Sequence, residues 1–258
     1  MRSFSLTTKV LLLVVLLLAG VSVNSQTSAR PKGYGSARQR EWDACYQRDA
    51  RSPKANWRDS LTVLNRQIAQ QPQSTDLRLK KAAVNIELEQ WEYAVEEYGR
   101  VLELDAENLS ALYFRAYAYN HLHRYDMARA DYEHFLHIMP RNFDAQLGLA
   151  MTKRNLGKVL ETQDELNRLV EMYPDSALAF AARAGYEAER EQYDLALFDW
   201  DEALRLQPGN QDYMVSKCCV LWAMKRYDEA RRLQDDLVKA GISRKSIQHL
   251  LDSQRKKH

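Results

Sequence analysis

Small and apolar side chains recur every 34 residues between residues 41 and 244. Units that begin at 41, 75, 109, 143, 177 and 211 align without insertion, and the clearest one runs from Leu109 to Asn142. Each unit has the length and patterning of two helices joined by a turn. The pattern therefore predicts an all-α chain of six helical hairpins, at 41-74, 75-108, 109-142, 143-176, 177-210 and 211-244.

Two positions of the unit are almost always small, and we expect them to be where the two helices of a hairpin touch. A larger side chain there would force the helices apart. The eighth position carries Arg48, Ala82, Ala116, Ala150, Ala184 and Cys218. The twentieth position carries Ser60, Ala94, Ala128, Thr162, Ala196 and Ala230.

Gap-filling, helix-breaking and capping residues repeat in the same register. The seventeenth position would fill the gap between neighbouring hairpins with Trp57, Trp91, Tyr125, Val159, Tyr193 and Tyr227. Proline at the thirty-second position of four units would stop the second helix. Side chains at the thirty-fourth position would cap the next helix by accepting backbone N–H bonds, and they are Ser74, Asn108, Asn142, Ser176 and Asn210.

This pattern resembles the tetratricopeptide repeat, in which Trp, Leu-Gly, Tyr, Ala, Phe and Pro stand at these spacings. In the unit 109-142 those places are held by Leu112, Arg115, Ala116, Tyr119, Ala128, Tyr132 and Pro140. The family's Trp, Leu, Gly and Phe are replaced, while the pattern of side-chain sizes is kept. The resemblance implies a right-handed α-solenoid of helix-turn-helix hairpins that holds another molecule in a concave groove.

Two units depart from the pattern. The first has Arg48 in place of a small residue and Pro53 between its helices, so we expect it to be distorted. The fourth has Lys153 where the family places tyrosine, and its second helix is polar. We expect this unit to be a flexible joint; the alternative is that its polar groups meet a ligand.

The chain ends have different compositions from the repeats. Residues 1-25 resemble a secretory signal peptide, with Arg2 and Lys9 before a short apolar run and cleavage expected after Ser25. The run is shorter than the roughly 20 residues that span a bilayer. Residues 26-40 are typical of a flexible linker. Residues 245-258 are predicted to form a capping helix with a basic tail, or alternatively a docking helix.

Charge argues against nucleic acid and anionic membranes as partners. The chain has 37 basic and 35 acidic side chains, and loss of Arg2 and Lys9 with the leader would balance them. Neither a basic stripe nor a basic amphipathic helix is evident. We therefore expect no nucleic-acid partner and no stable membrane insertion after cleavage.

The sequence contains no motif of a known catalytic or cofactor site. It has no Gly-rich phosphate loop, no G-x-S-x-G, no H-E-x-x-H and no paired Cys-x-x-Cys. His134 and His137 are three residues apart but fall on or near the outer face, so no metal and no cofactor is expected. Cys45 is too far along the array to pair with Cys218 or Cys219, and Cys219 is a candidate reactive thiol.

In such an array the first helix of each hairpin would line the groove. The groove positions favour apolar contact with an extended or helical peptide rather than capture of a C-terminal carboxylate, because the Lys, Asn and Arg set that family members use for that purpose is missing. The alternative is that these side chains pack between hairpins. The candidate contacts are Tyr113, Tyr117, Asn120, His121, Leu147, Met151, Arg154, Gly185, Cys219 and Trp222.

Two functions follow from these patterns. The first is a non-enzymatic protein-protein interaction scaffold of the cell envelope, in the bacterial periplasm, with a protein or peptide partner. The alternative is a periplasmic glycan- or small-ligand-binding accessory protein, since Tyr113, Tyr117 and Trp222 could stack on sugar rings. A secreted eukaryotic protein is the alternative location, in which case Asn108 would begin a glycosylation sequon.

Overall fold

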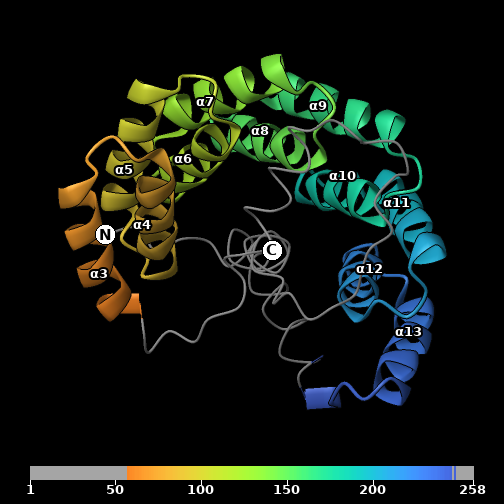
Figure 1. The fold of residues 1–258 in the computed structure, drawn as a ribbon. Coiled ribbons are helices and arrows are strands. Elements are labelled where there is room, and N and C mark those ends of the chain that lie inside the picture. Colours follow the sequence, from red (N-terminus) through yellow and green to blue (C-terminus); the bar gives the residue numbers. More distant parts are fainter. Residues whose placement is uncertain (1–56, 246, 248–258) are drawn as a thin grey trace, which may run out of the picture. The chain divides into compact units, whose positions relative to one another are not determined.

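A computed structural model describes residues 57–245 and 247 (Figure 1). The leader, the linker and the first helix of the first hairpin lie outside this range, as does most of the expected capping helix. Every secondary-structure element in the described range is a helix, which confirms the predicted all-α fold. The helices are α3 (Trp57–Gln70), α4 (Thr75–Glu87), α5 (Trp91–Leu104), α6 (Leu109–His121), α7 (Tyr125–Ile138), α8 (Phe143–Asn155), α9 (Val159–Met172), α10 (Ala177–Glu189), α11 (Tyr193–Leu206), α12 (Gln211–Ala223) and α13 (Tyr227–Lys239).

The helices begin in a regular register. First helices start at 75, 109, 143, 177 and 211, and second helices at 57, 91, 125, 159, 193 and 227. The first helices α4, α6, α8, α10 and α12 begin after a capping side chain, which accepts a hydrogen bond from a backbone N–H three residues on. The capping residues are Ser74, Asn108, Asn142, Ser176 and Asn210.

The turn inside each hairpin uses the left-handed backbone region at the fifteenth position of the unit. Glycine occupies this position only at Gly157, with φ 72°. The other four turns place a residue with a side chain there, at φ 58–61°, and these residues are Glu89, His123, Glu191 and Lys225. The turn geometry is therefore the same in five hairpins although glycine, the residue that adopts it most easily, is present in only one.

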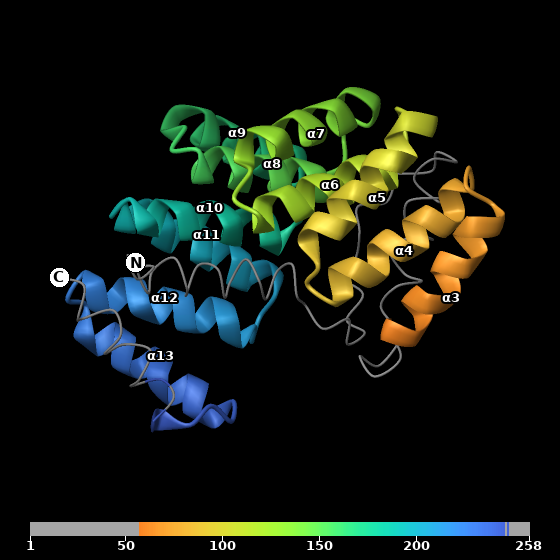
Figure 2. The same ribbon diagram turned by 90° about the vertical axis from the view of Figure 1, so that its left-hand side faces the viewer.

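The described chain divides into two compact units, and the boundary falls between Glu165 and Leu166, inside α9. In the N-terminal unit α4, α6 and α8 lie next to one another in one layer, and α3, α5 and α7 form the second layer (Figures 1 and 2). In the C-terminal unit α10 contacts α12, and each pairs with the helix that follows it. The boundary thus lies in the fourth hairpin.

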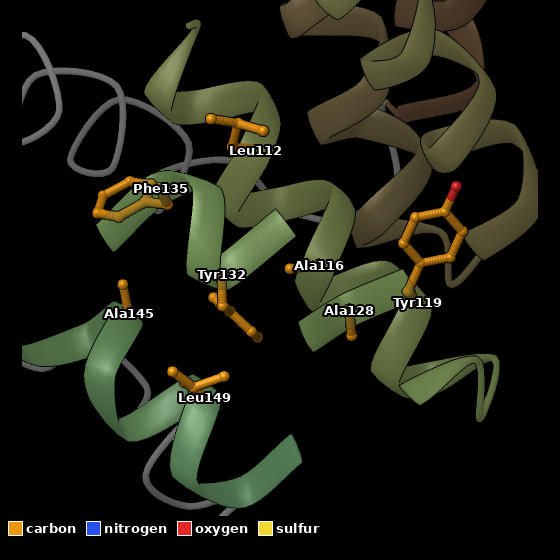
Figure 3. Packing of buried hydrophobic residues seen from close by; sticks show 8 residues of the cluster. All are labelled: Leu112, Ala116, Tyr119, Ala128, Tyr132, Phe135, Ala145 and Leu149. Atoms are coloured by element: carbon orange, nitrogen blue, oxygen red, sulfur yellow. The ribbon is translucent and has the colours of Figure 1, made fainter. Parts of the chain in front are cut away.

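The core of the N-terminal unit is built from alternating small and aromatic side chains (Figure 3). Ala116 and Ala128 are fully buried where α6 meets α7, and Tyr132 and Phe135 fill the space between α7 and α8. The ring of Tyr132 lies so close to α8 that a methyl group at Gly148 would come within 2.6 Å of it. The same burial holds at the other small positions of the array, Ala82, Ala94, Ala150, Ala184, Ala196, Cys218 and Ala230, each at most 1% exposed.

The last complete hairpin, α12 with α13, uses cysteine as its small residue. Cys218 is 1% exposed, and its thiol donates a weak hydrogen bond to the Ala230 carbonyl at 3.6 Å. Ala230 is itself fully buried at the twentieth position. The eighth and twentieth positions therefore meet directly across this hairpin.

Candidate binding face

The predicted groove residues divide between the two compact units. Tyr113, Tyr117, Asn120 and His121 lie on α6, and Leu147, Met151 and Arg154 lie on α8, all half-buried in the N-terminal unit. In the C-terminal unit Gly185 on α10 is buried, while Cys219 and Trp222 on α12 are half-buried. The structure therefore presents two separate candidate sets.

Tyr113 packs into the hairpin core. Its ring meets Phe114, Tyr132 and Phe135 edge-on, with centroids 5.2, 5.6 and 6.0 Å apart. Such edge-to-face arrangements stabilise aromatic clusters by about 1 kcal/mol per pair beyond area burial. The Tyr113 ring therefore helps to hold α6 against α7 through Tyr132 and Phe135.

Asn120 joins two neighbouring hairpins. Its side-chain amide donates to the Thr152 hydroxyl at 2.9 Å, and that hydroxyl lies 3.1 Å from the Asn120 carbonyl oxygen. Thr152 is fully buried on α8 and also donates to the Gly148 carbonyl at 2.7 Å. These bonds lie beneath the surface between α6 and α8, so Asn120 fixes the spacing of the two helices.

Tyr117 and His121 pack on the preceding hairpin. The His121 ring is stacked on Trp91 of α5 with centroids 3.8 Å apart, and Tyr117 meets Trp91 edge-on at 5.9 Å. Burial lowers the pKa of His121; the nearby Glu89 opposes this shift and His123 adds to it. The neutral imidazole is therefore the favoured form, and its ring face is used inside the array.

Tyr117, Leu147 and Met151 form what we call the first-helix face. Tyr117 and Met151 occupy the same ninth position on adjacent helices, and Leu147 lies one turn before Met151. Burial raises the pKa of the neighbouring Tyr132; Tyr117 and Asp144 add to that rise, and a side-chain hydrogen bond with Asn120 opposes it. The first-helix face thus consists of one aromatic and two apolar side chains, each half-buried.

The candidate residues of the C-terminal unit, Gly185, Cys219 and Trp222, are less suited to contact with a partner. Gly185 is buried, and Trp222 packs on Tyr227 with centroids 4.9 Å apart. Burial raises the pKa of Cys219 to about 12. A thiol in that state carries very little thiolate at neutral pH, which lowers its reactivity.

A set of charged positions inside the hairpins was not predicted. In the second, third and fifth hairpins the seventh position is basic and the twenty-third acidic. Arg115 makes two hydrogen bonds to Asp131 at 2.8 and 2.7 Å. Arg183 binds Asp199 in the same way at 2.6 and 2.8 Å. In the second hairpin Lys81 lies 2.7 Å from Glu97. The signal was available in the sequence as a charge repeat with the 34-residue period.

The fourth hairpin uses a different ion pair. Leu149 occupies its seventh position, and Lys153, four residues on, lies 2.9 Å from Glu165 and 3.5 Å from Glu161. Lys153 is only 9% exposed. Lys153, Glu161 and Glu165 therefore meet one another within this hairpin.

Neither a metal site nor a membrane span is found among residues 57–245 and 247. No group of three or more His, Cys, Asp or Glu side chains there is arranged to hold an ion, and His134 and His137 are exposed. In the same range, no helix combines the length and apolar character that crossing a bilayer requires.

Comparison with known proteins places the fold. No protein-family model matches the chain. The peptidyl-prolyl cis-trans isomerase FKBP4 of Bos taurus is 31% identical over 88 residues, which is 34% of this chain and 19% of that protein. Human FKBP4 is 26% identical over 113 residues, or 43% of this chain and 25% of the relative. The chain thus spans a quarter or less of the curated relatives it matches.

Solved structures match over much more of their length. A tetratricopeptide repeat protein from Parabacteroides merdae is 17% identical with a TM-score of 0.61, covering 96% of this chain and 98% of that one. PilF of Pseudomonas aeruginosa is 16% identical with a TM-score of 0.61, covering 83% and 98%. YrrB, described as having an unusual peptide-binding site, is 19% identical with a TM-score of 0.53, covering 72% and 96%. With its repeated helical hairpins, the chain is therefore a tetratricopeptide-repeat protein in its fold.

Proposed function

We propose that this protein is a non-enzymatic interaction scaffold whose first-helix face holds an extended or helical peptide segment. The fold is that of protein-protein interaction scaffolds, and YrrB is a neighbour described as binding peptide. The observation that carries the proposal is that Tyr117 and Met151 occupy equivalent positions on the neighbouring first helices α6 and α8, with Leu147 one turn before Met151, all half-buried. Partly covered apolar residues are typical anchors for a bound peptide because little side-chain entropy is lost when they are covered.

The glycan-binding alternative has less support. Stacking on a sugar ring requires an aromatic face that the protein leaves uncovered. Tyr113 packs edge-on to three rings, Tyr117 contacts Trp91, and Trp222 packs on Tyr227 in the other compact unit. These aromatics are spread through hairpin contacts and do not form the single exposed cluster that sugar stacking requires.

Selection from a random-peptide library on the purified chain tests the proposal. We expect enriched peptides to carry large apolar residues and to lose at least about tenfold in affinity for Met151→Glu or Leu147→Glu chains. Met127→Glu is a matched control, because Met127 is a 52% exposed methionine on α7, in the other helix layer. Peptides that bind all three variants equally, or no enrichment at all, would contradict the proposal.

The proposal includes an extracytoplasmic location, most simply the bacterial periplasm, and it rests on the leader pattern in residues 1-25. Interaction without catalysis is supported by the absence of catalytic motifs from the sequence. The match to FKBP4 adds no support for isomerase activity, since it covers only a small part of that protein.

A further inference from the structure

Glu187 is a buried carboxylate that the repeat pattern does not require. It occupies the eleventh position of its hairpin, on α10, and is only 4% exposed. Its Oε2 atom is buried and has no hydrogen-bond partner among the described residues. A buried charge without a hydrogen bond destabilises the folded state.

The cation next to Glu187, Arg183, is already engaged by other groups. The Arg183 Nε and Nη2 atoms donate to the two Asp199 oxygens at 2.6 and 2.8 Å, and Nη1 donates to Asn167 of α9 at 3.1 Å. Glu187 is left with a contact of 3.9 Å to Arg183 Nε. Ionised Glu187 and Asp199 therefore place two negative charges beside one guanidinium, with Glu171 of α9 adding a third negative charge that acts on Arg183.

The third hairpin provides a matched arrangement without the second carboxylate. Arg115 and Asp131 form the same two-bond pair at the seventh and twenty-third positions. The eleventh position there is Tyr119, and the guanidinium lies over its ring at 5.8 Å. The fold therefore accommodates an uncharged side chain at this position, and the carboxylate is particular to the α10–α11 hairpin.

We propose that Glu187 makes the α10–α11 hairpin a pH-responsive element of the array, packed tightly while its carboxyl is protonated and loosened when it ionises beside Asp199. The pKa of Glu187 is raised from 4.5 to about 7, mainly by burial, with Asp199 adding to the rise and Arg183 opposing it. Between those two pH values the folded hairpin holds a proton that the unfolded chain has released. The proton's stabilisation of the hairpin is therefore fully present below about 4.5, and it is lost progressively as the pH rises from there through about 7.

Hydrogen exchange of the full chain tests this inference, because repeat arrays open locally rather than all at once. Amide exchange in peptides from 177–206 is compared between the natural chain and Glu187→Gln at about pH 4 and about pH 8, and the comparison at equal pH cancels the intrinsic pH dependence of exchange. We expect similar rates near pH 4, where the carboxyl is protonated in the open and the folded states, and at least several-fold faster exchange in the natural chain near pH 8. A rate ratio that does not change with pH overturns the proposal.

Two controls keep the test decisive. Glu189→Gln removes an exposed carboxylate from the same helix. Its exchange rates should match those of the natural chain at both pH values. Glu187→Tyr copies the Arg115–Tyr119 arrangement and should remove the pH dependence as Glu187→Gln does. A carboxyl carbon titration of Glu187 in the natural chain is expected to have its midpoint near 7, and a midpoint near 4.5 would overturn the proposal even if both variants failed to fold.

Discussion

The imidazole of His121 lies flat on the indole of Trp91, with ring centroids 3.8 Å apart and planes 2° from parallel. The two residues come from neighbouring hairpins, at the end of α6 and the start of α5. Trp91 is the seventeenth residue of its unit, and its contact with His121 fills the gap between neighbouring hairpins, as expected for that position. A residue predicted to face a partner thus stabilises the stacking of repeats.

The stack predicts how His121 titrates. Burial lowers its pKa, so a ring titration by nuclear magnetic resonance should have its midpoint below the ordinary value of about 6.5. The unfolded chain then takes up this proton more readily than the folded chain, and the contact loses stability as the pH falls. Trp91→Ala should return the midpoint toward about 6.5. A midpoint at or above the ordinary value in the natural chain would show that the imidazole is not buried against Trp91.

Loss of the Arg115–Asp131 pair should destabilise the N-terminal unit. Asp131→Ala leaves a partly buried guanidinium without its carboxylate, and we expect a cost of about 2–4 kcal/mol in the free energy of unfolding. Lys80→Ala breaks an exposed pair with Asp76 instead and should cost less than about 0.5 kcal/mol. Denaturant unfolding of both variants measures the contrast, and equal costs would show that burial of the Arg115–Asp131 pair is unimportant.

Two helical glycines should respond oppositely to alanine. At Gly148 the added methyl would lie 2.6–2.9 Å from the Tyr132 ring, and we expect a loss of about 1–3 kcal/mol. At Gly99 the nearest atom is the end of the Arg115 side chain, 3.8 Å away, so alanine should be neutral or stabilise α5 by up to about 1 kcal/mol. Thermal unfolding separates the two outcomes. Tyr132→Leu combined with Gly148→Ala should recover part of the loss, and no recovery would assign the loss to another contact.

The leader predicts a defined mature N-terminus. Mass spectrometry of the chain recovered from the extracytoplasmic fraction should find Gln26 as the first residue. Charge at the position before the cut blocks cleavage of such leaders, so Ser25→Lys should retain the full leader. Recovery of the uncleaved chain in the cytoplasmic fraction would count against the proposed location.

The sequence predicted the positions that build the repeats, whereas it did not distinguish side chains that pack between hairpins from side chains that are left to face a partner. Ala116 and Ala128 were expected where the two helices of a hairpin touch, and both are fully buried. Small residues that recur at a fixed spacing indicate such a contact because larger side chains would force the helices apart. Tyr113 and Asn120 occupy groove positions of the register, yet they pack on Tyr132 and bond to Thr152. A half-exposed side chain between two hairpins can pack against the neighbouring hairpin or contact a partner. The spacing of residues along the chain does not distinguish these two roles.

By itself, the sequence determined the all-α repeat fold, the 34-residue step and the caps that start the first helices, because each depends on local propensity and on contacts repeated in every hairpin. Only the tertiary structure decided which polar residues pair. Arg183 reaches Asp199 across a hairpin, and Glu187 remains beside them without a hydrogen bond for its Oε2 atom. The reason is that the charge of a buried group depends on its surroundings in three dimensions, which no periodicity along the chain records.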